Sequence, residues 1–121
     1  MHALVIEDQF LIATLIEEEL RDLGYTSVQI VDREVDAVEA ARERCPDLIT
    51  ADDSLTEGSG INAVRAICAD WAIPVVFIVG DPERVKPLVP DAILIGKPFG
   101  GCQLRDAVAQ AVEMHGCLVL G

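Results

Sequence analysis

The stretch LITADDSLTEGSG, residues 48–60, sets the pattern from which the rest of the chain can be interpreted. Four mostly apolar residues, 48–51, end at two adjacent aspartates, Asp52 and Asp53, and a largely small and polar segment follows. A short, continuous apolar run of this kind is typical of a strand that is buried on both faces of a parallel sheet. Carboxylates at the end of a buried strand are costly unless something binds them. The stretch therefore predicts a strand and a functional position directly after it.

Runs of apolar residues predict four further strands. The clearest are Ala3–Ile6 and Ile73–Val79, and weaker runs lie at Thr26–Val31 and Asp91–Ile95. Between these runs, apolar residues recur at the three- and four-residue spacing of helices. The helical stripes are Ile12, Ile16, Leu20 and Leu23; Val35, Val38 and Ala41; Ile61, Val64 and Cys68; and Leu104, Val108 and Val112.

Strands that alternate with helices indicate β-α-β units with right-handed crossovers. We predict one α/β domain over residues 1–121, with a doubly wound sheet of five parallel strands in the order 2-1-3-4-5, as in flavodoxin-like folds. The fourth helix should be short or irregular, or the segment Asp81–Pro90 should be a plain loop, because this segment contains three prolines. A proline inside a helix removes a backbone donor and clashes with the preceding turn. The apolar tail, residues 116–121, has no assigned role.

Composition and charge exclude several classes of function. The 121 residues carry a net charge of −12, and such a surface repels nucleic acid and anionic membranes. The four cysteines form no CxxC pair and the two histidines lie near the chain ends, which argues against a zinc site or a redox dithiol. No apolar run approaches the roughly 20 residues of a membrane span, and no signal-peptide core follows the N-terminus. We expect a cytoplasmic protein that binds neither nucleic acid nor membrane.

Charged residues recur at the carboxyl ends of the predicted strands, where functional groups gather in open α/β sheets. They are Glu7 and Asp8 after the first strand, Asp52 and Asp53 after the third, and Lys97 after the fifth. An acidic pair alone at a strand end is more often a helix cap or a solvated turn. Together in one crevice they should hold a cation, since two unit charges 4 Å apart repel by about 4 kcal/mol at an effective dielectric constant of 20. All-oxygen ligation favours Mg²⁺, and Lys97 could balance an anion such as a phosphoryl group.

With these residues assigned, the chain resembles the receiver domains of two-component response regulators. The resemblance covers nearly the whole chain, and its motifs are ALVIED (3–8), PDLITAD (46–52), PVVFIVG (74–80) and GKPF (96–99). The segment DPERV (81–85), followed by a proline-bearing loop and KPF (97–99), is similar to the receiver half of alphaproteobacterial general-stress regulators.

The family spacing implies that Asp52, rather than Asp53, is the phosphoacceptor. Asp52 stands six residues after Pro46 and eight before Gly60, which matches the family's spacing on both sides. No role is assigned to Asp53. The resemblance also implies a Pro98 peptide bond that is often cis in the family.

The same resemblance implies the roles of the other strand-end residues. Glu7 and Asp8 match the acidic pair that supports Mg²⁺, and Asp52 shares the ion with them. Ser54 matches the position whose backbone carbonyl ligates the metal. Lys97 matches the lysine that contacts the phosphoryl group.

The chain departs from the family at two switch positions. Val79 stands where receivers usually have Thr or Ser at the end of the fourth strand, and Leu94 replaces an aromatic residue three positions before the lysine. A hydrogen bond to a charged group is worth about 1.5–3 kcal/mol. Without the hydroxyl, phosphorylation should shift the loop populations less.

We expect a single-domain response regulator, not an enzyme, that accepts a phosphoryl group on Asp52 from a sensor histidine kinase or a histidine phosphotransfer protein. Such a protein would act by contact with a downstream protein target or as a phosphate sink. An alternative is a pseudo-receiver that binds a partner without phosphorylation, which Val79 and Leu94 favour. A small Mg²⁺-dependent phosphohydrolase has less support, because ADDSL (51–55) lacks a second aspartate two residues after the first. The oligomeric state is left open.

Overall fold

The computed structural model describes the backbone of residues 1–120 and the side chains of residues 1–114. Five parallel strands form one sheet in the order β2-β1-β3-β4-β5, as the sequence predicts. The strands are His2–Ile6 (β1), Ser27–Val31 (β2), Leu48–Ala51 (β3), Val75–Val79 (β4) and Ile93–Gly96 (β5). The β4 strand begins after Pro74 rather than at Ile73, because proline has no N–H for the ladder.

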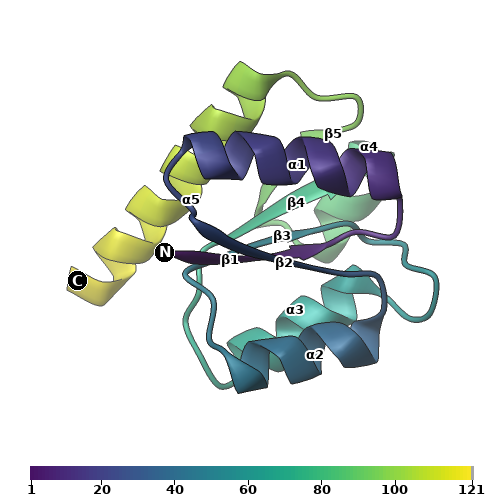
Figure 1. Ribbon diagram of the computed structural model, residues 1–121, viewed down its shortest axis with the longest axis horizontal. Helices are drawn as coiled ribbons and strands as arrows, with labels where there is room; N and C mark the ends of the chain where they lie inside the picture. The colour runs from purple at the N-terminus through teal and green to yellow at the C-terminus, as the bar shows by residue number, and fades with distance from the viewer. Residues whose placement is uncertain (121) are drawn as a thin grey trace.

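Helices cover both faces of the sheet. Figure 1 shows α1 and α5 on one face and α2 and α3 on the other. The helices are Phe10–Asp22 (α1), Glu34–Glu43 (α2), Gly60–Cys68 (α3), Pro82–Val85 (α4) and Gly101–Leu120 (α5). No helix among the described residues is long and apolar enough to cross a membrane. The predicted tail, residues 116–121, lies outside the residues whose side chains are described.

Two apolar cores lie on opposite sides of the sheet, because successive strand residues point to opposite faces. In β1, Leu4 and Ile6 pack with residues of α2 and α3, whereas Ala3 and Val5 pack with residues of α1 and α5. All five residues of β1 and all four of β3 are buried. Burial on both faces explains why these strands are continuous apolar runs rather than alternating ones.

The fourth helix is short, as predicted. Asp81 caps it by accepting a hydrogen bond from the backbone N–H of Arg84, and Pro82 occupies its first turn. After four residues the chain tightens into a single 3₁₀ turn, Lys86–Leu88 (η1), which contains Pro87. Within residues 81–90 only Val85 is buried, so this segment is held to the body of the fold by little apolar contact.

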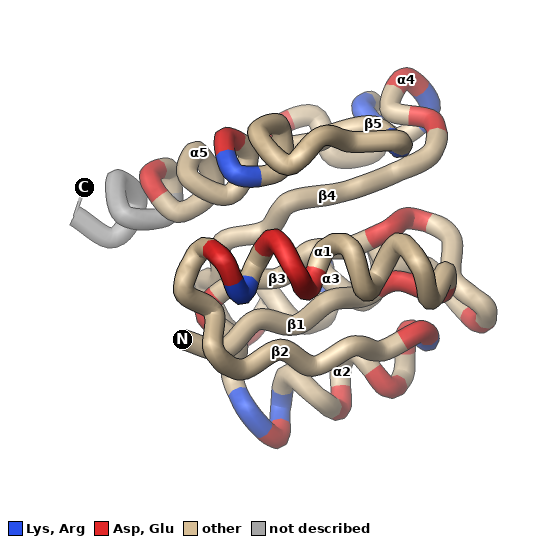
Figure 2. The backbone as a smooth tube through the Cα atoms, turned by 45° about the horizontal axis from the view of Figure 1, so that its top comes forward, with Lys and Arg blue, Asp and Glu red and all other residues tan. Residues whose placement is uncertain are grey.

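Acidic residues lie on elements at both faces of the sheet and at the loops that follow the strands (Figure 2). Part of this charge is paired, since Arg21 contacts Glu17 within α1 and Arg105 of α5 contacts Glu19. With 21 acidic residues against nine basic ones, most of the acidic side chains have no basic partner to neutralise them.

Candidate functional site

The carboxyl ends of the strands meet at one edge of the sheet and form a cleft of about 680 Å³. The register between β1 and β3 pairs Ile6 with Ala51, so the next residues, Glu7 and Asp52, lie side by side. The backbone N–H of Asp52 donates to the carbonyl of Ile6 over 2.9 Å, which extends the ladder to Asp52. The predicted residues Asp8, Asp52, Ser54 and Lys97 all line the cleft.

Three of the predicted acids form one cluster. Glu7, Asp8 and Asp52 each offer a carboxylate oxygen, and these three atoms lie within 4.8 Å of one another. Asp8 is exposed, whereas Glu7 is 2% and Asp52 7% exposed. Burial raises the pKa of the Glu7 carboxyl and that of the Asp52 carboxyl above their ordinary values. The ionised cluster is thus disfavoured on its own, and a cation in it would be stabilising.

Lys97 joins the two buried acids. Its Nζ lies 2.8 Å from Glu7 Oε1 and 2.9 Å from Asp52 Oδ2, and it donates to Gln9 Oε1 over 3.2 Å. Burial works to lower the pKa of the Lys97 ammonium, but its hydrogen bonds and charge interactions with Glu7 and Asp52 outweigh burial and raise it. Lys97 therefore stays charged. The Lys97–Pro98 peptide bond is cis, as the resemblance implies.

The connection from β3 to α3 depends on a glycine. A Cβ on Gly60 would lie 1.6 Å from the carbonyl oxygen of Asp52, so no other residue fits there without moving the backbone. Ser59 caps α3 by accepting hydrogen bonds from the N–H groups of Ile61 and Asn62. The family spacing between Asp52 and Gly60 thus has a physical reason: the start of α3 lies against the Asp52 backbone.

Asp53, which has no role in the sequence-based prediction, forms an ion pair with Arg84 of α4. Asp53 is 8% exposed, and its backbone N–H donates to Asp52 Oδ1 over 2.8 Å. Burial would raise the pKa of the Asp53 carboxyl, but its hydrogen bonds with Asp52 and Arg84 and the guanidinium charge outweigh burial and lower it. The available signal was Arg84 itself, a cation placed soon after the end of the fourth strand.

Neither of the two departures from the family pattern lines the cleft. Val79 is fully buried and belongs to the same core cluster as Val85 of α4. Leu94 on β5 is half-buried and packs against this cluster. The cleft wall at the end of β4 is instead Gly80, where an added Cβ would meet nothing within 4 Å. Val79 therefore presents no hydroxyl to Asp52.

The sequence profile of the response regulator receiver domain matches residues 3–109 of this chain. The chain belongs to the response regulator receiver family. Receivers are typically signalling modules without an enzymatic activity of their own, and phosphorylation and Mg²⁺ binding are general to the family.

Among curated relatives, this receiver is 36% identical over 115 residues to the phyllosphere-induced regulator PhyR of Methylorubrum extorquens. The match covers 90% of this chain and 42% of the relative's length, so the chain spans less than half of that protein. The solved structure of a mutant of the anti-anti-sigma factor PhyR from Bartonella quintana is similar, with a TM-score of 0.79 and 34% identity. That match covers 93% of this chain and 48% of the other.

A second similar structure carries a metal. The receiver domain of the sensor histidine kinase PA1611 from Pseudomonas aeruginosa PAO1 has a magnesium ion coordinated in its active site cleft. It matches this receiver with a TM-score of 0.80 and 25% identity, over 93% of this chain and 97% of that one.

Proposed function

We propose that this receiver accepts a phosphoryl group on Asp52 from a phosphohistidine of a partner protein, with Mg²⁺ bound beside it. The observation that carries the proposal is the position of the Lys97 ammonium, 2.8 Å from a carboxylate oxygen of Glu7 and 2.9 Å from one of Asp52. The site thus combines a nucleophilic carboxylate, a fixed positive charge and an acidic cluster at one edge of the sheet.

The residues present fit a magnesium ion. Glu7, Asp8 and Asp52 supply hard oxygen ligands within 4.8 Å of one another, and Mg²⁺ prefers such ligands. Glu7 Oε1 is buried, and beyond its ion pair with Lys97 it accepts no hydrogen bond among the described residues, so that oxygen has an unused lone pair. We expect these carboxylates and the backbone carbonyl of Ser54 to hold the ion. When bound, it would neutralise charge that develops on the transferred oxygens.

In the proposed step, one carboxylate oxygen of Asp52 attacks the phosphorus of the donor in line with the bond that breaks. A P–O bond forms on Asp52 as the donor's P–N bond breaks, and the histidine ring nitrogen leaves with the electron pair of that bond. Lys97 is already within 2.9 Å of Asp52 Oδ2, so its charge is in place for the phosphoryl oxygens without reorganisation.

Burial of Asp52 has two consequences for this step. Burial raises the pKa of the Asp52 carboxyl, and the Lys97 ammonium opposes this shift by stabilising the charged form. A partly desolvated carboxylate is also a stronger nucleophile than one fully surrounded by water. The cleft is open to solvent on the side that Asp8 and Ser54 line, which leaves a path for a donor side chain.

The partners we propose are a sensor histidine kinase or a histidine phosphotransfer protein upstream, and a protein target or a phosphate-sink role downstream. The net charge of −12 makes nucleic acid an unfavourable direct target. The likeness to PhyR, which in Bartonella quintana is described as an anti-anti-sigma factor, supports output through protein contact. Such partners would place this receiver in the cytoplasm.

A second candidate function is a pseudo-receiver that binds its partner without phosphorylation. The specific observation in its favour is that Val79 presents no hydroxyl and lies in the core rather than in the cleft. Both functions predict the same fold, and they differ only in whether Asp52 is ever modified.

Phosphoryl uptake separates the two candidates. The receiver is incubated with acetyl phosphate and Mg²⁺, and the mass of the intact protein is followed with time. Our proposal predicts the addition of one phosphoryl group, which chelation of Mg²⁺ prevents. If the mass of this protein stays unchanged while a control receiver takes up a phosphoryl group under the same conditions, the result would support the pseudo-receiver instead.

A further inference from the structure

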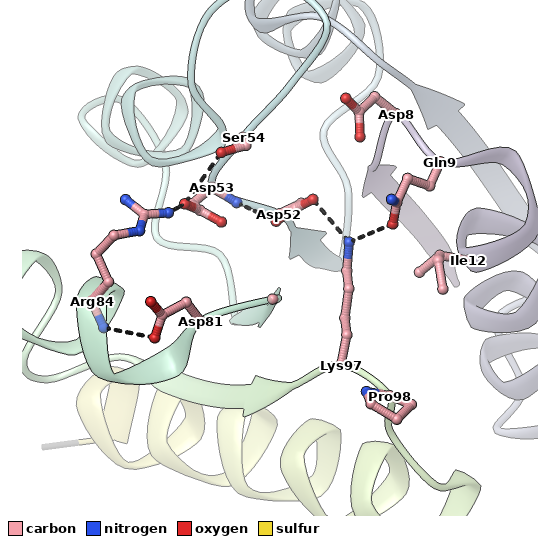
Figure 3. A pocket seen from close by; sticks show the side chains of 11 residues that line it. Asp8, Gln9, Ile12, Asp52, Asp53, Ser54, Asp81, Arg84, Lys97 and Pro98 are labelled. Carbon is pink, nitrogen blue, oxygen red and sulfur yellow. Dashed lines mark hydrogen bonds and ion pairs between the residues drawn. The ribbon is translucent and has the colours of Figure 1, made fainter.

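The cleft has a cation on each side of Asp52. Of the described residues that line it, Lys97 and Arg84 are the cationic ones. Figure 3 shows Lys97 pointing to Asp52 from the segment just after β5, and Arg84 of α4 reaching Asp53 from the other side. Asp8, which belongs to the acidic cluster that fits a metal, lies on the Lys97 side of Asp52.

The two cations are bound very differently. The Lys97 side chain is 13% exposed and is shared between Glu7 and Asp52. The Arg84 side chain is 55% exposed, and its guanidinium contacts one carboxylate, that of Asp53. Arg84 is therefore the more exposed of the two cations and has one carboxylate partner to leave, the buried Asp53, whereas Lys97 would have to leave two.

The partner of Arg84 is the residue directly next to the proposed acceptor. The Asp53 backbone N–H donates to Asp52 Oδ1 over 2.8 Å, so the Arg84 guanidinium is held beside the carboxylate that would be modified. A phosphoryl group on a side chain carries a charge of about −1.5 to −2 near neutral pH. Two phosphoryl oxygens can accept two parallel hydrogen bonds from a planar guanidinium. A phosphoryl group on Asp52 would therefore be a stronger partner for Arg84 than the Asp53 carboxylate, which also has other hydrogen bonds.

We propose that Arg84 is the switch residue of this receiver: once Asp52 carries a phosphoryl group, the Arg84 guanidinium transfers from Asp53 to the phosphoryl oxygens and moves α4 with it. The inference rests on the proposed function, since it needs the modified Asp52. It assigns to Arg84 the reporting role that Val79, without a hydroxyl, cannot perform.

The segment that carries Arg84 is built to follow such a movement. Val85 is the one buried residue of residues 81–90, and it packs in the same core cluster as Val79. Segments with few buried apolar contacts open and shift at low cost. The end of η1 is held by a hydrogen bond from Arg65 to the Leu88 carbonyl and by Val89 against the core. A displacement of Arg84 would therefore move α4 relative to that end and change the surface beside β5.

Hydrogen exchange of residues 81–90 tests the inference in the full chain. The protein is labelled with acetyl phosphate and Mg²⁺, the labelled fraction is measured by intact mass, and amide exchange is compared with and without label. Labelling should change exchange in this segment of the wild type. In Arg84→Gln, labelling of Asp52 should persist at a lower steady-state fraction, and the exchange change per labelled molecule should be lost. Arg84→Lys keeps the positive charge but lacks the planar guanidinium, so it should retain only part of the change in exchange.

Lys86→Gln is the matched control, because it removes a cation from the same segment at a position that does not line the cleft. It should show the wild-type exchange change. Three outcomes would each overturn the inference alone. Arg84→Gln could show the full wild-type change in exchange, or the labelled wild type could show no change in exchange in residues 81–90. The third outcome is an Arg84→Gln protein that takes up no label. An unlabelled wild type would instead contradict the proposed function, and the inference would fall with it.

Discussion

Gly60→Ala should displace Asp52, the proposed phosphoacceptor, without unfolding the protein. The added Cβ would lie 1.6 Å from the Asp52 carbonyl oxygen and 2.8 Å from its carbonyl carbon, where Cβ atoms essentially never come within 3.0 Å of such a neighbour. The obstacle is backbone, so the start of α3 or Asp52 itself must move. Overpacking of this kind costs about 1–3 kcal/mol, and disruption of the Ser59 cap adds about 1 kcal/mol. Typical domains have about 5–15 kcal/mol of stability, so the fold should survive.

The effect on the site should be far larger than the effect on the fold. A misplacement of about 1 Å can cost about 10²-fold in rate, and we expect that loss in the initial rate of Asp52 labelling by acetyl phosphate. Urea unfolding, measured in parallel, corrects the rate for the folded fraction. Gly100→Ala is the control, because its added Cβ would meet nothing within 4 Å, and it should be labelled at the wild-type rate. A folded Gly60→Ala protein labelled as fast as Gly100→Ala would refute this reasoning.

Three further predictions concern charge and packing. Lys97→Met keeps an unbranched side chain but loses the ammonium beside Asp52. It should slow the labelling of Asp52 by about 10²-fold, as removal of one hydrogen-bond donor to the transition state does. A labelling rate near that of the wild type would contradict the role of Lys97. Because burial raises the pKa of Asp52, its ionised form destabilises the fold. Asp52→Asn should therefore raise Tm at pH 7 in the absence of Mg²⁺. The gain in Tm should shrink as the pH falls through the raised pKa of Asp52 toward its ordinary value of 3.8. A lower Tm for Asp52→Asn than for the wild type would contradict this reasoning. Leu104→Ala in α5, fully buried, should cost about 2–5 kcal/mol in urea unfolding, whereas Val112→Ala, 43% exposed, should cost under about 0.5 kcal/mol.

The topology could be predicted because each buried strand is a continuous apolar run bounded by turn residues. Sheets covered on both faces leave that signal whatever the tertiary details. The number and order of elements therefore followed from alternation alone, and the prolines at 82, 87 and 90 explained the short α4.

The buried face of a helix was harder to predict than its existence. In α2 the apolar stripe began at Val35, yet Val35 is 74% exposed and the buried residues are Ala37, Ala40 and Ala41. Small alanines let a helix lie close to the sheet. Close packing, rather than the positions of the large apolar residues, therefore determines which face of α2 is buried.

Of the site, the sequence predicted the residues that parallel strands bring to one edge. Glu7, Asp52 and Lys97 meet there because strand ends in a parallel sheet share an edge, which is a rule of topology. The pairing of Asp53 with Arg84 was not predictable in this way. It depends on how a short, proline-bounded helix is oriented, and a side-chain contact of that kind leaves no spacing pattern in the chain.

The most direct test of the account is to locate the label after incubation with acetyl phosphate and Mg²⁺. Peptide mapping of the labelled wild type should find one phosphoryl group, on Asp52. Asp53→Asn removes the neighbouring carboxylate and leaves Asp52 intact, so it should still be labelled. Asp52→Asn should not be labelled. A label on Asp53, or an Asp52→Asn protein labelled to the wild-type extent, would contradict the assignment of Asp52 as the phosphoacceptor.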